Sequence, residues 1–191
     1  MRLLFFKAAV AASVLLAIDT AASADDYVID AAHSGVNFKI SHLGLAYVHG
    51  RFDSFSGKFT IDSSDPAKSS FALNIKPETV DTNNMGRDTH LRGPDFFNVK
   101  QYPVISFTST SVKPSEEGYE VTGDLTLHGA TKPVTFSLKG GKSAEFPAGV
   151  KRTGYSTELV LKRSEFGVGK PMPALGDDIF VSISFEGTKK G

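Results

Sequence analysis

The chain has 191 residues, and its 21 basic and 21 acidic side chains give a formal net charge of zero. No strong field is therefore expected to attract nucleic acid or an anionic membrane, and we expect no nucleic-acid partner. The chain contains no cysteine, which excludes disulfides and thiol chemistry, so the fold must be held together by burial alone.

The first 24 residues have the pattern of a secretory signal peptide. Arg2 and Lys7 are basic, residues 8–18 are mostly apolar, and Ala22-Ser23-Ala24 provides a small-x-small cleavage site. Cleavage after Ala24 would leave one domain, residues 25–191; the alternative is a retained amphipathic N-terminal helix. No later stretch is long and apolar enough to cross a bilayer, so we expect no integral membrane span. Export without cysteine fits a bacterial periplasm, with full secretion as the alternative.

The domain opens with the pattern of half-buried β-strands. Every second residue from Val36 to His42 shares one face, so His42 is expected to point inward with its apolar neighbours. The apolar positions then slip by one between Phe52 and Phe55. We interpret that slip as a β-bulge inside one long strand over about 47–62.

The same alternation recurs to the end of the chain, with turn signals between the runs. The segments GGKS (140–143) and GVGK (167–170) look like fragments of phosphate-binding loops, but neither has the full spacing, and we predict turns at both. The further apolar runs lie at about 71–75, 105–107, 119–127, 134–138, 155–161 and 179–185.

These runs predict an all-β fold of about eight antiparallel strands, which is either a sandwich or a barrel. Two features favour the barrel. Gly50, Gly57 and Gly123 lie inside or at the edge of strands, where glycine permits coiling. The run over about 47–62 is also long for a flat sandwich strand, whereas tilted barrel strands are often long.

One segment, MGRDTHLRGPDFF (85–97), breaks the strand pattern. We predict a short helix over about 83–92 that closes one end of the barrel, with Asn83 or Asn84 as its N-cap and Gly93-Pro94 ending it. Arg87, His90 and Leu91 would share one helix face. Arg87 then either binds the polar head of a ligand, as its planar fork of donors suits a phosphate or carboxylate, or pairs with Asp88 or another acid and only fixes the lid.

Phenylalanine is the strongest compositional signal, with 15 in the chain, most of them on inward-facing positions. They either fill a solid core, which is the commoner fate of strand aromatics, or line a cavity for an apolar ligand. Phe38, Phe52 and Phe107 are the candidates for such a lining, while Leu91, Phe96 and Phe97 would plug the end beside the helix.

Catalytic and metal-binding signatures are weak. The five histidines, at positions 33, 42, 49, 90 and 128, form no close pair at ligand spacing, so we predict no metal site and no cofactor. An enzymatic alternative would use His42 or His90 as a general base in a lipid isomerase or hydrolase. No nucleophile or orienting acid accompanies them, so we predict a protein that is not an enzyme.

Four blocks of sequence resemble the YceI-like family, and together they cover about Asp26–Gly187. The blocks are YVIDAAHSGVNFKISHLGLAYVHGRFDSFSGKFTID, VDTNNMGRDTHLRGPDFFNVKQYPVISFTST, GDLTLHGATKPVTFSLK and LKRSEFGVG. The resemblance implies a periplasmic, lipocalin-like, extended antiparallel β-barrel whose apolar cavity binds a long-chain amphiphile. That ligand would be a polyisoprenoid with a quinone-like or pyrophosphate-like end, or a fatty acid or fatty amide. The resemblance also implies roles in lipid transport or storage and in stress responses, and it assigns no catalytic residues.

We therefore expect residues 25–191 to form a YceI-like lipid-binding barrel. A solid-core protein without a ligand remains the competing hypothesis, and exposed aromatics or sheet edges would support a homodimer whose surface the sequence does not locate. The candidate ligand-binding residues are Phe38, His42, Phe52, Arg87, His90, Phe97 and Phe107.

Overall fold

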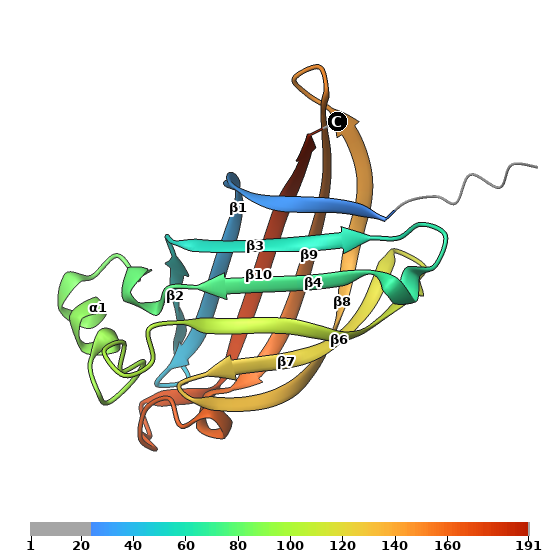
Figure 1. The fold of residues 1–191 in the computed structure, drawn as a ribbon. Helices are drawn as coiled ribbons and strands as arrows, with labels where there is room; N and C mark the ends of the chain where they lie inside the picture. Colours follow the sequence, from blue (N-terminus) through green and yellow to red (C-terminus); the bar gives the residue numbers. More distant parts are fainter. Residues whose placement is uncertain (1–23, 191) are drawn as a thin grey trace, which may run out of the picture.

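The computed structural model of the protein describes residues 24–190, which form a continuous antiparallel sheet of ten strands wound into a barrel (Figure 1). The predicted signal peptide lies almost entirely outside the described residues. Within residues 24–190, no helix has the length and apolarity needed to cross a membrane. The elements are β1 (Asp25–His42), β2 (Ala46–Phe52), β3 (Phe55–Ile61), η1 (Pro66–Lys68), β4 (Ser70–Ile75), η2 (Pro77–Thr79), β5 (Val80–Asp81), α1 (Met85–Arg92), β6 (Ile105–Ser115), β7 (Gly118–Leu127), β8 (Ala130–Glu145), β9 (Val150–Lys162), η3 (Arg163–Phe166) and β10 (Leu175–Lys190).

Eight of the ten strands close the ring. β1 pairs with β10 on one side, and its first residues pair with β3 on the other. From β3 the ring passes through β4, β6, β7, β8 and β9 back to β10. The second half of β1 pairs instead with β2, which carries the two-residue β5 at its outer edge. The predicted all-β, eight-stranded antiparallel barrel is confirmed.

A bend in the middle of β1 allows this one strand to serve two neighbours. The pairing with β10 shifts register between Asp30 and Gly35. At the bend the hydroxyl of Ser34 donates to the carbonyl of Asp30 at 2.7 Å. Arg152 Nη1 on β9 reaches across to the carboxylates of Asp30, at 2.8 Å, and of Glu186 on β10, at 3.1 Å. The bend is therefore tied to both strands that follow it around the barrel.

The single long strand predicted over about 47–62 is wrong. β2 ends at Phe52 and β3 begins at Phe55, because the backbone N–H groups between them turn to another partner. Asp53 N donates to the carbonyl of Thr79 at 3.3 Å, and Ser54 N donates to Thr79 Oγ1 at 3.0 Å. The slip in the alternation marks a strand break, not a bulge.

The turn predicted at Gly140-Gly141 is also wrong. β8 continues through both glycines to Glu145, with an irregular register opposite β9 between Gly140 and Ser143. Both glycines have positive φ, 133° and 91°, and a Cβ on Gly140 would lie 2.3 Å from the carbonyl oxygen of Gly154. Glycine is therefore needed at this position for an irregular strand and not for a turn.

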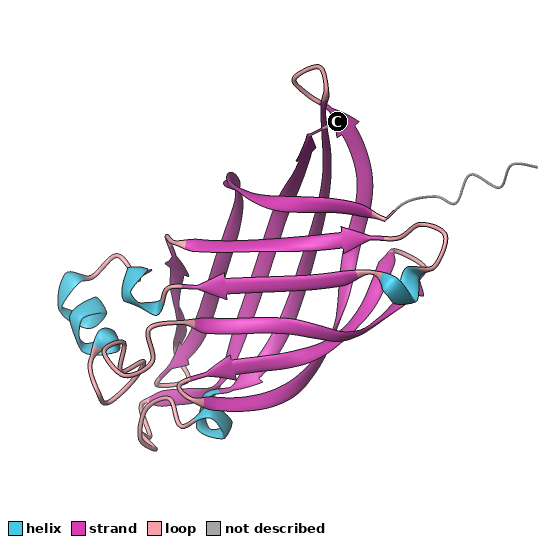
Figure 2. Cartoon of the chain, viewed as in Figure 1, coloured by secondary structure: helices cyan, strands magenta, loops and turns pink. Residues whose placement is uncertain are grey.

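The predicted short helix is confirmed as α1, which lies outside one end of the barrel (Figures 1 and 2). Asn84 is the N-cap, and its side-chain oxygen accepts the backbone N–H of Arg87 at 2.9 Å. Gly93 ends the helix, and its own N–H bonds to the carbonyl of His90 at 3.0 Å. Capping by Asn and a stop at Gly-Pro are the signals on which the prediction relied.

Two buried clusters divide the interior along the barrel. One lies toward α1 and includes Val36, Phe52, Val80, Phe96 and Phe166. The other lies toward the opposite end and is mainly aromatic, with Phe59 at its centre. Between them the walls enclose the cavity described below, so the interior is neither uniformly solid nor uniformly hollow.

The ion pairs at the β1 bend predict a specific pH dependence. Hydrogen bonds from Arg152 and then His33 lower the pKa of Asp30 from its ordinary value of 3.8 to about 2. Because the folded-state pKa is the lower one, this contact stabilises the fold above the ordinary pKa and is lost as the pH falls toward about 2. Asp30→Asn should lower the urea midpoint at pH 7, and the difference from wild type should shrink below about pH 4.

Asp124→Asn is the matched control, because Asp124 is exposed and makes no ion pair with any residue in the range 24–190. The urea midpoint of Asp124→Asn should equal that of wild type both at pH 7 and below about pH 4. A difference between Asp30→Asn and wild type that stays constant down to pH 2 would contradict the ion-pair explanation.

Candidate functional site

A cavity of about 500 Å³ occupies the barrel interior between α1 and the far aromatic cluster. This volume lies within the range of about 300–1,000 Å³ that is usual for small-molecule sites. Most of the lining is aliphatic or aromatic, and it contains no Asp or Glu among the described residues. The cavity therefore suits an apolar chain, and any charge that its lining contributes is positive.

All seven candidate residues line this one cavity, although they come from five separate segments of the chain. β1, β2 and β6 supply the side chains of the barrel wall. α1 and the loop after it supply those at the end of the barrel near α1, which we call the open end. The structure thus brings them together as the alternation and helix spacing predicted; that they contact a ligand stays a prediction. They are Phe38, His42, Phe52, Arg87, His90, Phe97 and Phe107.

The large rings leave a cavity because several of them lie over glycines of a neighbouring strand. A Cβ on Gly50 would lie 2.4 Å from Cζ of Phe38, and a Cβ on Gly123 would lie 2.5 Å from Cζ of Phe107. Without a side chain beneath it, each ring can lie flat along the wall instead of projecting into the centre. The sequence interpretation of these glycines, coiling alone, missed this packing role.

The far end of the cavity is closed by stacked aromatic rings. The centroid of the Phe59 ring lies 5.0 Å from that of Tyr27 and 5.6 Å from that of Phe71, both in stacked geometry. The ring of Tyr155 meets Phe59 edge-on at 5.8 Å. Burial raises the pKa of the Tyr155 phenol above its ordinary value, so it stays neutral. This cluster forms an uncharged floor.

At the open end, α1 turns one face toward the cavity. Arg87, His90 and Leu91 all line it, as their spacing predicted. The ring of Phe97, in the loop after α1, meets Phe52 edge-on at 5.6 Å and so fixes this loop to the barrel wall. Phe96 is buried beside the ring of His90, with 5.0 Å between centroids.

Within residues 24–190, Arg87 has Thr82 and not a carboxylate as its partner. Its Nε donates to Thr82 Oγ1 at 2.7 Å and its Nη2 donates to the Thr82 carbonyl at 2.6 Å. Asp88 instead accepts the backbone N–H of Thr82 at 2.9 Å. Among residues 24–190, no carboxylate oxygen lies within 4.0 Å of the Arg87 guanidinium. The alternative in which Arg87 pairs with Asp88 is wrong, although the hydrogen bonds to Thr82 do hold the lid in place.

The two histidines of the lining differ in their surroundings. His90 lies 3.4 Å from a carboxylate oxygen of Asp95, and both side chains are exposed. His42 ends β1 at the rim of the cavity. No serine, threonine or cysteine of the described residues hydrogen-bonds to either ring. Neither histidine is therefore arranged as the base of a nucleophile.

Sequence reasoning missed Arg163, the second guanidinium at the open end. Arg163 is buried, with 6% of its surface exposed, and lines the cavity. Its Nε donates to the Gly176 carbonyl, and its Nη1 donates to the carbonyls of Val168 and Lys170, at 2.9–3.1 Å. No carboxylate of the described residues lies within 4.0 Å. The available signal was the alternation of inward and outward side chains, because Arg163 continues the inward-facing series of β9 through Leu159 and Leu161.

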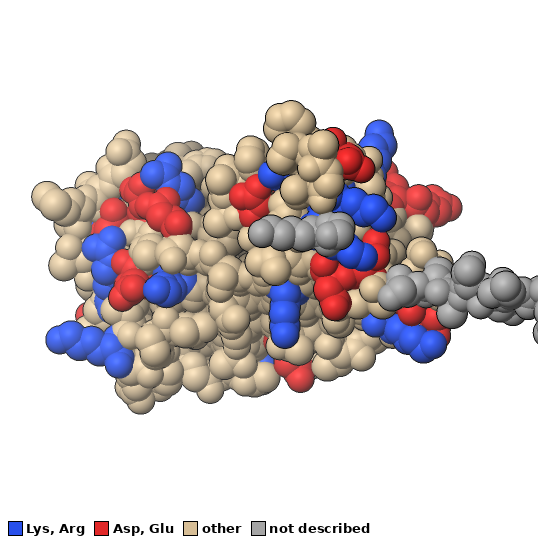
Figure 3. All heavy atoms as spheres, turned by 45° about the horizontal axis from the view of Figure 1, so that its top comes forward, with Lys and Arg blue, Asp and Glu red and all other residues tan. Residues whose placement is uncertain are grey.

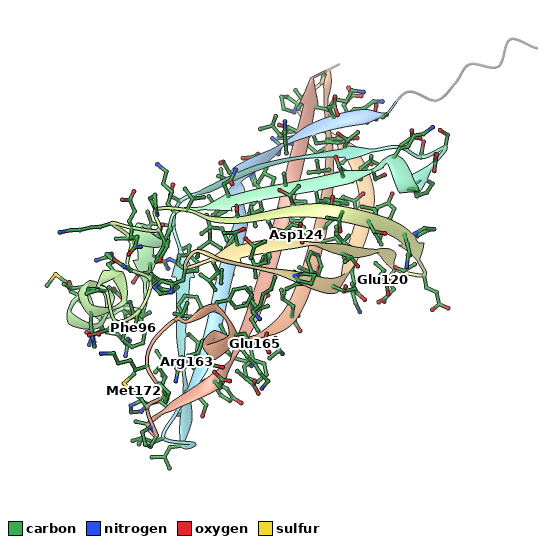
Figure 4. The ribbon with its side chains drawn as sticks, turned by 60° about the horizontal axis from the view of Figure 1, so that its bottom comes forward. Phe96, Glu120, Asp124, Arg163, Glu165 and Met172 are labelled. Atoms are coloured by element: carbon green, nitrogen blue, oxygen red, sulfur yellow. The ribbon has the colours of Figure 1, made fainter. Side chains whose placement is uncertain are left out.

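The segment after Arg163 forms a second lid. Gly167 and Gly169 have positive φ, 68° and 74°, which confirms a turn at GVGK. A Cβ on Gly169 would lie 2.9 Å from Arg163 Nη1 and 3.0 Å from Cε1 of Phe96. The two lids therefore touch, and Figure 4 shows Phe96, Arg163 and Met172 at the same end of the barrel, away from Glu120.

One group of possible metal ligands exists among residues 24–190, formed by Asp30, His33 and Glu186. Arg152 Nη1 lies 2.8 Å from the first carboxylate and 3.1 Å from the second. The two acids therefore already share one guanidinium, and the group acts as the ion-pair network of the β1 bend. It lies apart from the cavity lining.

Comparison with known proteins agrees with this architecture. The chain is 40% identical over 181 residues to Protein YceI of Escherichia coli O17:K52:H18, with 94% of each chain covered. The crystal structure of the Campylobacter jejuni YCEI protein matches with a TM-score of 0.71 at 32% identity, covering 80% of this chain and 91% of that one.

A polyisoprenoid binding domain from Saccharophagus degradans, implicated in plant cell wall breakdown, matches with a TM-score of 0.64 and covers 86% of this chain and 98% of that domain. At 18% identity this likeness concerns the fold alone. The sequence model of the YceI-like domain matches residues 27–187, which is nearly the whole barrel. With this match and the Escherichia coli relative, the chain belongs to the YceI-like family.

Proposed function

We propose that this protein binds one long-chain amphiphilic lipid, with its tail in the cavity and its polar head at the open end. One observation carries the proposal: an apolar cavity without a single acidic side chain opens beside two guanidinium groups that have no carboxylate partner in the described residues. Anionic heads match such donors, because the planar guanidinium binds phosphate and carboxylate oxygens in pairs.

The preferred ligand is a polyisoprenoid or an isoprenoid-quinone-like lipid, and a fatty acid or fatty amide is the alternative. The family membership and the fold shared with a domain described as polyisoprenoid binding support the first choice. Burying the tail contributes roughly 25 cal/mol per Å² of apolar surface, less the cost of ordering the chain. This energy depends on area, so the tail supplies affinity and the head supplies selectivity.

The proposed setting is the bacterial periplasm, reached through a signal peptide at residues 1–24, and the proposed role is transport or storage of the lipid, including under stress. The arrangement of the lining supports binding and not turnover. No serine or threonine in the described part of the chain hydrogen-bonds to His42 or His90, and the acid near His90 is the exposed Asp95. The bound lipid should therefore be recovered chemically unchanged.

Native mass spectrometry of the full chain, recovered from a bacterial periplasm, tests the function directly. We expect a mature protein starting at Asp25 that carries one long-chain adduct, which solvent extraction then identifies as isoprenoid or fatty acyl. A protein of apo mass, unchanged after incubation with both lipid classes, would contradict the proposal and favour a solid core. A recovered protein that still begins at Met1 would contradict only the predicted signal peptide and would leave the lipid-binding proposal unaffected.

Selectivity for the head group predicts an unequal effect of Arg87→Ala. Loss of a charged hydrogen-bond donor should weaken binding of geranylgeranyl phosphate by about tenfold to a hundredfold. Binding of geranylgeraniol, which has the same chain and a neutral head, should change by less than about twofold. Both affinities can be measured by displacement of a fluorescent lipid.

Arg92→Ala is the matched control on the same helix. Arg92 donates to the carbonyls of Glu78 and Val80 at 2.6 and 2.8 Å and is not part of the cavity lining. Any loss in this variant should be equal for the two heads. Equal losses for both ligands in Arg87→Ala would rule out its role at the head.

The packing of rings over glycines predicts that Gly50→Ala reduces the space for a tail. The new methyl group would displace the Phe38 ring into the cavity, because its three nearest atoms, at 2.4–2.9 Å, all belong to that ring. Ligand affinity should fall, and overpacking should lower the free energy of unfolding by about 1–3 kcal/mol.

Gly154→Ala is the control, since a Cβ there meets nothing closer than 3.4 Å. It should keep both the affinity and the stability of wild type, apart from the small change expected when glycine is replaced in a strand. Unchanged affinity in Gly50→Ala would show that the Phe38 ring does not limit the space for a tail.

A further inference from the structure

The turn between β1 and β2 exposes two leucines beside the open end of the cavity. Leu43 is 56% exposed and Leu45 is 83% exposed, and we call Leu43-Gly44-Leu45 the leucine tip. The tip follows His42 directly, which lines the cavity. Leu43 N also donates to the carbonyl of Ala174 at 2.8 Å, which joins the tip to the second lid.

The backbone conformation of the tip is unfavourable for a leucine at position 43. Leu43 has a φ of 56° and Gly44 a φ of 68°, so both are left-handed, as in the tightest hairpin turns. Asn-Gly is the favoured pair for such turns, and a bulky side chain in this region is an outlier. The other non-glycine residues with positive φ in the range 24–190 are Asn83, Asn98 and His128, which are types that tolerate it.

The outer wall next to the tip continues this surface, and we call Lys39, Tyr47, Val160 and Phe180 the wall patch. The rings of Tyr47 and Phe180 meet edge-on at 5.6 Å, and the ammonium of Lys39 lies 5.0 and 5.4 Å from their centroids. Val160 pairs with Phe180 in the sheet and is 54% exposed. Tyrosine and a lysine with its stem along apolar surface are the residues that favour a membrane interface.

The charges near the tip do not oppose a phospholipid surface. No acidic residue occurs between Val36 and Phe52. The acids at the start of β10 are engaged, because Asp177 accepts two hydrogen bonds from Ser164 and Asp178 pairs with Lys162 at 2.8 Å. Figure 3 shows basic and acidic side chains interspersed on a face turned away from the tip, and the formal net charge of the chain is zero. Attraction would therefore come from apolar insertion and not from a long-range field.

We propose that the leucine tip and the wall patch dock the open end of the barrel on the surface of a phospholipid bilayer. The size of the tip favours this occupant over a protein. Together the tip and the wall patch comprise seven residues, well below the roughly 20–30 residues per side of a stable protein interface. Insertion of a few apolar side chains to about 5–10 Å, in contrast, is how peripheral elements bind lipid. The purpose of docking rests on the proposed function, because a lipid could then pass between the bilayer and the cavity without exposing its tail to water.

The test uses the double variant Leu43→Asn, Leu45→Ser, since asparagine is a usual residue in this turn and should leave the fold intact. Partition onto vesicles of phosphatidylethanolamine and phosphatidylglycerol, measured by co-sedimentation, should fall about tenfold. The rate of transfer of a fluorescent isoprenoid from these vesicles to the protein should fall in parallel. The equilibrium affinity for geranylgeranyl phosphate in solution should be unchanged.

Val28→Thr is the matched control, because Val28 is 64% exposed in the first half of β1, on the other side of the bend from the tip. It should partition and transfer lipid like wild type. Equal partition of the double variant and wild type would overturn the docking proposal, as would a loss of self-association in sedimentation without any effect on vesicles, which would make the tip a contact with a second copy.

The two proposals fail separately in this design. Tip-dependent partition of a protein that takes up no lipid would overturn the proposed function and uphold docking. Tight binding of geranylgeranyl phosphate by a protein that does not partition onto vesicles would uphold the proposed function and overturn the docking proposal.

Discussion

The hydrogen-bonded seam between β1 and β10 is the constraint on which the rest of the molecule depends. It turns an open sheet into a closed ring, and closure pairs the edges of β1 and β10 that would otherwise invite aggregation. An eight-stranded ring has an interior that side chains can just fill or that can hold one small ligand. This barrel lies between these cases, because rings such as Phe38 and Phe107 lie over glycines of the adjacent strands and leave the centre open.

Both guanidinium groups of the cavity lining lie at the open end. The inward series of β9 reaches Arg163 where the strand stops, and α1 turns Arg87 toward the rim. Both guanidinium groups are held by backbone carbonyls or by Thr82, so their donors are positioned without a neutralising acid from residues 24–190. The opposite end closes with stacked, uncharged rings. The cavity is thus directional, with one end suited to an anionic group and the other suited only to hydrocarbon.

The sequence predicted features that depend on neighbours along the chain. Alternation located the strands, and Asn84 and Gly93 bounded the helix, because period and capping are local. It failed where a distant partner decides the outcome. Thr79 ends β2 by taking the backbone donors of Asp53 and Ser54, and Gly154 explains why Gly140 sits inside a strand. Arg163 was overlooked because a charged residue after a strand usually indicates a loop, and only its parity indicated the interior.

The separation of the core into two clusters affects where the barrel can open locally. Stability in a protein is unevenly distributed, and segments with short strands and few shared hydrogen bonds open at lower free energy than the whole. The end with α1 and the two-residue β5 has this character, whereas the end around Phe59 is crossed by long paired strands. Phe107 packs against both clusters and marks the boundary between them. Amide protons near α1 are therefore expected to exchange faster than those of the strands around Phe59, because the end near α1 can open locally while the rest of the barrel stays folded.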